Sequence, residues 1–208
     1  MHTHALGRYM DCIYRDDWQS VGELMLSSAR KLAAIGSEFL ICPDNTIHQA
    51  LPYIEERLPL PWLHIADAVA TAAVEKGFRR IGLTGTRYLV ESDVYPRKLS
   101  ARGLESVRPT AAERDEIDRI IMDELVYGKF TPEAITYFQR VMERMKNEGC
   151  DAVVLGCTEI PLIMNDSNSP LPTLDSTRLL ARAALRWAVK GRHSPDLVPG
   201  DTSPMPVR

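Results

Sequence analysis

Three short apolar runs in this chain of 208 residues each end in a polar loop and continue into a helical pattern. The polar loops carry Asn45-Thr46, Gly85-Thr86 and Cys157-Thr158. Strands that alternate with helices predict a parallel sheet with helices on both faces. Three similar strand ends further predict an α/β fold of two similar parallel-sheet domains that face a shared cleft, although no close internal repeat is visible.

The clearest strand end lies between Asp151 and Pro161. Its apolar residues 152–155 are typical of a buried strand in a parallel sheet, and Gly156 indicates a sharp turn or a close approach of the backbone. Residues 157–159 should then lie at the carboxyl end of a central strand, where open α/β sheets bind ligands. A thiol there suits nucleophilic or proton-transfer chemistry, because oriented N–H groups favour the thiolate. The alternative is a buried core cysteine.

A second polar loop, Cys42-Pro-Asp-Asn-Thr-Ile-His48, follows another predicted strand. Asn, Thr and free amides at a helix start are the groups that an α-carboxylate needs. Asp44 and Asn45 are equally good turn formers, and Thr46 a helix cap. For His48 a structural role is favoured over a functional one.

Periodicity and capping residues predict the other elements. Strands are expected at residues 1–6, 38–41, 62–65, 80–84, 104–107 and 171–174. Helices are expected at 18–34, at 49–57, from an N-cap at Asp67 to Gly77, from Tyr88 to Gly103, after a capping box at Thr110 and Glu113, from Thr131 to Gly149, and at 176–190. His64, inside a predicted strand, is expected to be a core histidine.

Composition excludes several classes of protein. The formal net charge is −3, so no strong field attracts nucleic acid or membrane, and no apolar run approaches the roughly 18 residues that span a bilayer. Four cysteines without a Cys-x-x-Cys pair, and no signal-peptide pattern at the start, predict a cytoplasmic protein with reduced thiols. His2 and His4 have no matching acidic or cysteine cluster, so no metal site is expected.

These motifs resemble the cofactor-independent aspartate/glutamate racemase superfamily, in its amino-acid racemase branch. The resemblance extends over roughly residues 2–188 and is carried by Asp44–His48, Pro61–Asp67, Gly82–Thr86 with Tyr88 and Tyr95, and Val154–Pro161. It implies two domains that enclose a small amino acid, most simply aspartate or glutamate. One acid/base group would stand on each side of the α-carbon, without pyridoxal phosphate or metal. It also suggests a homodimer.

The resemblance assigns roles to particular residues. Cys157 would be one acid/base, and Glu159 would orient its neighbours or cap the next turn. Lys129 would bind the distal carboxylate of a dicarboxylic substrate, or be an exposed loop lysine. The residues implied to bind the substrate α-carboxylate are Asn45, Thr46, Thr86 and Thr158.

The chain departs from the family at two places. Asp44 stands where the family usually has a cysteine. Asp44 could be the second base if burial raises its pKa; otherwise a site with one thiol suits an isomerase or decarboxylase of small dicarboxylates. The family also begins with a Gly-rich strand and helix that have no match here, which predicts a first domain truncated at its N-terminus, or a non-catalytic remnant.

The predicted domain division follows from these patterns. Residues 1–66 with 173–190 would form the first α/β domain, and residues 67–172 the second. Residues 191–208, rich in proline and poor in apolar side chains, are expected to be a disordered tail.

Overall fold

A four-stranded parallel sheet forms the centre of the larger of two lobes in this computed structural model, which describes residues 1–190. Its strand order is β4-β3-β5-β6, and Thr84 at the end of β3 lies opposite Leu155 at the end of β5. The strands are β3 (Arg80–Thr84), β4 (Glu105–Val107), β5 (Ala152–Leu155) and β6 (Thr173–Asp175).

Helices cover both faces of this sheet, as the alternating pattern predicts. On β5, Val153 and Leu155 pack with helices α6 and α7, whereas Ala152 and Val154 pack with α3 and α5. All four residues of β5 are therefore buried, which explains why its sequence is apolar throughout. The helices of this lobe are α3 (Ile65–Glu75), α4 (Arg87–Glu91), α5 (Val94–Ser100), α6 (Ala111–Asp123), α7 (Pro132–Asn147) and the 3-10 turns η3 (Leu125–Tyr127) and η4 (Ile160–Leu162).

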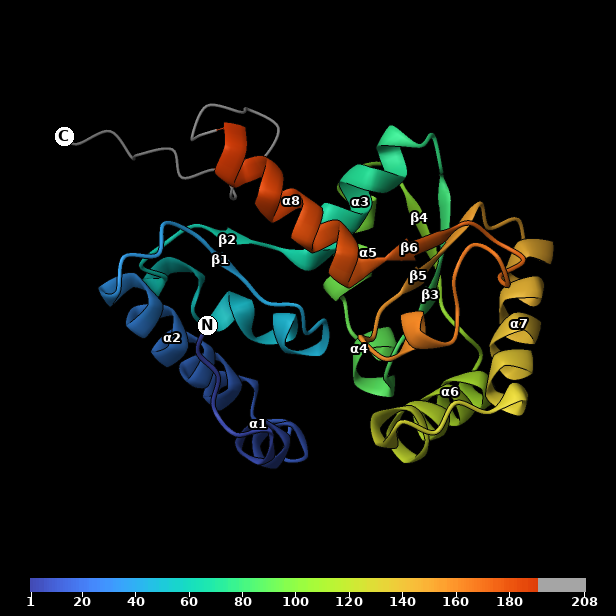
Figure 1. The fold of residues 1–208 in the computed structure, drawn as a ribbon, viewed down its shortest axis with the longest axis horizontal. Helices are drawn as coiled ribbons and strands as arrows, with labels where there is room; N and C mark the ends of the chain where they lie inside the picture. Colours follow the sequence, from blue (N-terminus) through green and yellow to red (C-terminus); the bar gives the residue numbers. More distant parts are fainter. Residues whose placement is uncertain (191–208) are drawn as a thin grey trace.

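The smaller lobe, blue to cyan in Figure 1, is built around a parallel pair of two-residue strands, β1 (Leu40–Ile41) and β2 (Trp62–Leu63). Its core contains Tyr9, Val21 and Leu26 from two helices, and Ile54 from between two 3-10 segments. The helical elements are α1 (Leu6–Ile13), α2 (Trp18–Ala34), η1 (Thr46–Tyr53) and η2 (Glu55–Arg57).

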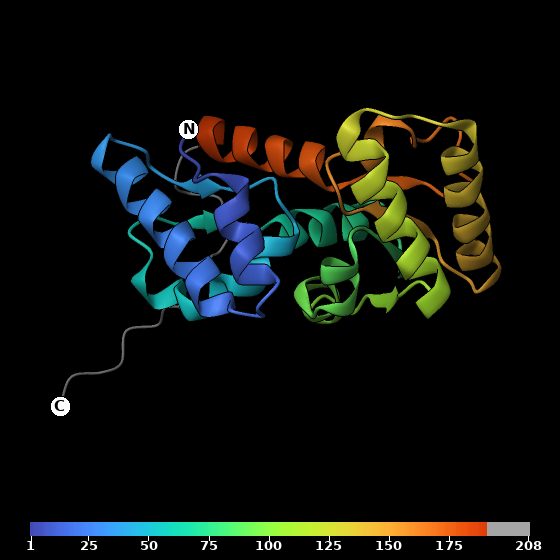
Figure 2. The same cartoon turned by 90° about the horizontal axis from the view of Figure 1, so that it is seen from below.

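Helix α8 (Ser176–Lys190) connects the two lobes, and Figure 2 shows it running from the sheet of the larger lobe toward the smaller one. Its Leu180 and Ala183 form a buried cluster with Leu63 of β2 and Ile65 of α3. Strand β6, directly before α8, pairs with β5 in the larger sheet. The domain boundaries at 66/67 and 172/173 remain predictions, and strand pairing adds that β6 shares the sheet of β3 and β5.

Two sequence expectations about local structure are wrong. Residues 1–5 form no strand, and helix α1 follows them because Tyr9, Cys12 and Ile13 recur at helical spacing and are buried. The N-cap of α3 is His64, not Asp67: the His64 ring accepts a hydrogen bond from the Ala66 N–H at 3.1 Å, and the Lys98 ammonium contacts Asp67 at 2.7 Å. His64 is therefore a half-buried cap and not part of a strand.

Other elements agree with expectation or differ in detail. The capping box of Thr110 and Glu113 and the cap of α7 at Thr131 are confirmed. The helix expected at 49–57 is a pair of 3-10 segments, with Pro52 inside the first. The helix expected from Tyr88 to Gly103 is divided into α4 and α5. The disordered tail predicted at 191–208 lies outside the described residues.

Candidate active site

The predicted strand ends come together where the two lobes meet. Gly156 follows β5, and its N–H donates to the Thr84 carbonyl oxygen at 2.9 Å. A Cβ atom on Gly156 would lie 2.5 Å from that same oxygen, a contact too short for any side chain. The sequence expectation of a close backbone approach at Gly156 is confirmed, and this approach fixes where the chain enters the Cys157 loop.

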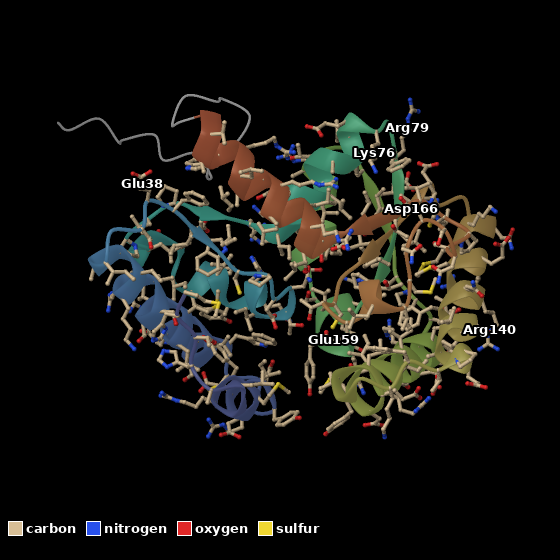
Figure 3. The ribbon with its side chains drawn as sticks, viewed as in Figure 1. Glu38, Lys76, Arg79, Arg140, Glu159 and Asp166 are labelled. Atoms are coloured by element: carbon tan, nitrogen blue, oxygen red, sulfur yellow. The ribbon has the colours of Figure 1, made fainter. Side chains whose placement is uncertain are left out.

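Glu159 is the immediate partner of the Cys157 thiol. Its Oε2 atom accepts hydrogen bonds from Cys157 Sγ at 2.9 Å and from Thr158 Oγ1 at 2.7 Å. Figure 3 places Glu159 on the side of the larger lobe that faces the smaller lobe, beside η4. Burial, and next the hydrogen bond to Glu159, raise the pKa of Cys157 well above that of a free thiol. At neutral pH the group is therefore a protonated thiol.

Asp44 follows β1, and its carboxylate accepts a hydrogen bond from the Ile47 N–H at 3.0 Å. Asp44 is exposed at the surface of its loop, although many protein atoms lie around its carboxylate. Burial and the negative charge of Glu159 raise the pKa of Asp44, while N–H groups of Ile47 and Thr46 lower it. The charge of Asp44 in turn raises the pKa of Cys157. The three acidic groups therefore form one electrostatic unit.

Two of the predicted carboxylate-binding hydroxyls lie together. Thr46 Oγ1 of the smaller lobe and Thr86 Oγ1 of the larger lobe are 3.0 Å apart. Thr86 also caps α4 by accepting from the Leu89 N–H at 3.4 Å. The hydroxyls at the starts of η1 and α4 therefore lie side by side, while the neighbouring Ile47 and Arg87 N–H groups donate to the Asp44 and Asp118 carboxylates.

Asn45 is held differently from the other predicted ligands. It is 3% exposed, its amide nitrogen donates to Ser176 Oγ at 3.0 Å, and its amide oxygen accepts from Tyr95 OH at 2.7 Å. These bonds engage the amide oxygen and one amide N–H within the protein. Ser176 was not singled out by the sequence; its only signal is its position directly after the last strand.

His48 has the structural surroundings that the sequence favoured. Its Nδ1 lies 2.7 Å from the Asp44 carbonyl oxygen, and its Nε2 accepts from Trp62 Nε1 at 3.3 Å and from the Ile65 N–H at 3.4 Å. Because a carbonyl only accepts, Nδ1 carries the proton and the ring is neutral. Burial lowers the pKa of His48 to about 4, which keeps it neutral. The Asp44 loop is thereby tied to β2 and to the start of α3.

In the described part of the chain, Lys129 makes no polar side-chain contact with these groups. It is exposed in the turn between η3 and α7, and neither a hydrogen bond nor an ion pair joins its side chain to a site residue. Two surface cavities lie elsewhere, one beside α5 and β4 and one at the start of α7. Within residues 1–190 no group of three His, Cys, Asp or Glu side chains is arranged to hold a metal, and no helix is long and apolar enough to cross a membrane.

Known proteins resemble this chain in sequence and in fold. The chain is 22% identical over 172 residues to the broad specificity amino-acid racemase RacX of Bacillus subtilis (strain 168), a match that covers 81% of this chain and 73% of that protein. It is 26% identical over 186 residues to a glutamate racemase of Thermus thermophilus, covering 86% of this chain and 63% of the relative.

Among solved structures, a Yersinia pestis protein with a provisional Asp/Glu racemase assignment superposes with a TM-score of 0.83 at 32% identity. That match covers 89% of this chain and 81% of the other. The family model for Asp/Glu/hydantoin racemases matches residues 8–184. The two-lobed α/β fold, the strand-end motifs and these matches agree: the chain belongs to the Asp/Glu/hydantoin racemase family, whose named relatives here are isomerases that act on amino acids.

Proposed function

We propose that this chain racemises an amino acid without a cofactor, with Cys157 and Asp44 as the two acid/base groups. The observation that carries the proposal is the electrostatic unit of these residues with Glu159, built from strand ends of both lobes. Inversion at an α-carbon needs one group that removes the proton and another that supplies a proton to the opposite face. A thiol and a carboxylate from facing loops are suited to this division of work.

The resting protonation states set the direction of the first step. The raised pKa keeps Cys157 protonated, so the thiol is proposed as the acid. Asp44, in its carboxylate form, is proposed as the base. Asp44 removes the α-proton of one enantiomer while Cys157 donates its proton to the other face of the α-carbon. The enzyme is left as a carboxylic acid and a thiolate, which together perform the reverse reaction on the opposite enantiomer.

The main obstacle is the low acidity of the α-proton, because the carbon that carries it is bonded to a negatively charged carboxylate. The hydroxyls of Thr46, Thr86 and Thr158 are proposed to bind that carboxylate and to stabilise the charge that develops on it. We further propose aspartate or glutamate as the substrate, with Lys129 receiving the distal carboxylate.

Exchange of the α-proton in D₂O tests this function. Wild-type protein should incorporate deuterium at Cα of aspartate or glutamate and interconvert the enantiomers, followed by mass spectrometry and chiral chromatography. C157S and D44N should each lose racemisation by at least about 100-fold, the typical contribution of one acid/base group. C150A, which removes a buried thiol of the core, is the control and should retain activity. Absence of exchange with every acidic amino acid contradicts the proposal.

Lys129 has its own test. If its ammonium binds the distal carboxylate, K129M should raise KM for aspartate or glutamate about tenfold, because a charge-assisted hydrogen bond contributes about 1.5–3 kcal/mol. KM for a neutral amino acid that is also a substrate should not change. Equal effects on charged and neutral substrates would exclude this role.

A second candidate function follows from aspartate at position 44, where the family usually has cysteine. A site with a single thiol would isomerise or decarboxylate small dicarboxylates. In that case D44N keeps its activity while C157S loses it, and product analysis with maleate or an arylmalonate identifies the reaction. Loss of activity in both variants favours the racemase.

A further inference from the structure

A buried chain of hydrogen bonds runs between the two acid/base loops. Ser176 Oγ is 2.8 Å from the Leu155 carbonyl oxygen and 3.0 Å from Asn45 Nδ2, and Tyr95 OH is 2.7 Å from Asn45 Oδ1. The three side chains are almost completely buried, with 0% exposure for Ser176, 1% for Tyr95 and 3% for Asn45. Buried polar groups of this kind are costly unless each has its partner, so the arrangement is tightly specified.

The direction of every bond in this chain is determined. The Leu155 carbonyl can only accept, so the single Ser176 proton points to it, and Ser176 Oγ accepts from the Asn45 amide. The Asn45 oxygen then accepts the Tyr95 proton. Rotating the Asn45 amide would place its oxygen against Ser176 Oγ, whose single proton already goes to the Leu155 carbonyl, so two acceptors would face each other. A single orientation of all three groups is therefore favoured.

The ends of the chain are next to the proposed acid/base groups. Leu155 is the last residue of β5, two positions before Cys157, and Asn45 directly follows Asp44. Ser176 is the first residue of α8 and the hub between them. We propose that Ser176 is a positioning residue that fixes the spacing between the Cys157 and Asp44 loops.

This inference rests on the proposed function, because spacing matters most where two groups act on one α-carbon. Each group must reach that carbon from opposite sides, and a misplacement of about 1 Å can cost roughly 100-fold in rate. The same series of hydrogen bonds gives Asn45 its role. Its amide connects the two loops, so its contribution to catalysis is made through position and not through its oxygen contacting the substrate.

The test compares S176A with the matched variant S169A. Ser169 Oγ also donates to a backbone carbonyl, that of Leu171, at 2.7 Å, and its side-chain hydrogen bonds in the described chain reach only Met142 and Leu171. Both variants should lose thermal stability. S176A should lose 10- to 100-fold in kcat with KM within about threefold, whereas S169A should keep kcat within about twofold.

Two further measurements separate positioning from stability. In S176A, misplaced loops should raise the ratio of α-deuterium exchange to racemisation, because one group can still exchange the proton without inversion. Y95F, which removes one hydroxyl at nearly constant volume, should give a smaller change in the same direction. It replaces S176A if that variant fails to fold.

Alkylation of Cys157 by iodoacetamide, followed site by site with mass spectrometry, needs no substrate. S176A should change this rate at least about threefold and S169A should not. If the wild type shows no α-proton exchange, the proposed function fails, while the alkylation comparison still decides whether Ser176 positions the loop. Unchanged kcat, exchange ratio and alkylation rate in a folded S176A variant would overturn the inference.

Discussion

At the scale of residues, the proposed chemistry depends on the pairing of Cys157 with Glu159. Glu159 Oε2 accepts the thiol proton at 2.9 Å, and its charge raises the pKa of both Cys157 and Asp44. The sequence indicated that Glu159 would either orient its neighbours or cap a turn. The contact distinguishes these roles, since no capping hydrogen bond from its side chain is present at η4.

We expect E159Q to make Cys157 more reactive. Removing the neighbouring charge lowers the pKa of the thiol and so increases the thiolate fraction at a fixed pH of about 8. Because a less basic thiolate is also less nucleophilic, the alkylation rate should rise only about threefold for each pKa unit. T158A, which keeps the Glu159 charge, is the control. A slower or unchanged rate in E159Q, measured by site-resolved mass spectrometry with iodoacetamide, would contradict this role.

At the scale of elements, the sequence predicted what local periodicity and caps determine. Helices α2 and α8, strand β3, and the capped starts of α6 and α7 lie where expected. Helix α1 was missed, because its short apolar face has meaning only once α2 is there to cover it. The cap of α3 was placed at Asp67 instead of His64 because histidine is not a usual capping residue.

The candidate site likewise contains residues that local sequence predicts and residues that only the packing of distant elements reveals. The motifs placed Cys157, Asp44, Thr46 and Thr86 at strand ends, and the fold brings these ends together. Ser176 could not be found this way, since its contact with Asn45 joins residues 131 positions apart. Such pairings arise from the packing of whole elements and leave no local signature.

His48, which joins the Asp44 loop to β2 and α3, should make the stability of the protein depend on pH. Its pKa is about 4 in the fold and about 6.5 in the unfolded chain, so the unfolded state binds more protons between these values. Stability is therefore lost as pH falls from 6.5 to 4, by on the order of 3 kcal/mol from this residue. The raised pKa of Asp44 changes stability with pH in the opposite direction, and it does so equally in the wild type and in the H48Q variant.

The H48Q variant has no imidazole that can titrate. The difference in unfolding free energy between wild type and H48Q should therefore shrink as pH falls from about 6.5 to about 4. Urea titrations at several pH values measure it. W62F removes the hydrogen bond to Nε2 without removing a titrating group and should reproduce the wild-type pH dependence at lower stability. Parallel curves for wild type and H48Q would show that His48 does not titrate as described.

At the scale of the whole molecule, both lobes contribute to the site, so they must hold a defined relative position. Helix α8 and the start of α3 share a buried cluster with β2, and side-chain hydrogen bonds cross between lobes at Thr46–Thr86 and Gln49–Tyr88. These contacts predict that the lobes unfold together, in one cooperative transition.

The three tryptophans allow a direct test, because Trp18, Trp62 and Trp187 all lie in the smaller lobe or in α8. Phe138, 0% exposed, lies in the core of the larger lobe. F138A should lower the free energy of unfolding by about 3–5 kcal/mol and the urea midpoint by roughly 1–2 M. If the lobes unfold as one, tryptophan fluorescence reports this shift although no tryptophan is near the mutation, and it coincides with circular dichroism. V21A, in the core of the smaller lobe, should likewise shift both signals together. A fluorescence transition that F138A leaves in place would mean that the lobes unfold independently, and that the spacing of Asp44 and Cys157 is maintained only by the contacts at the site itself.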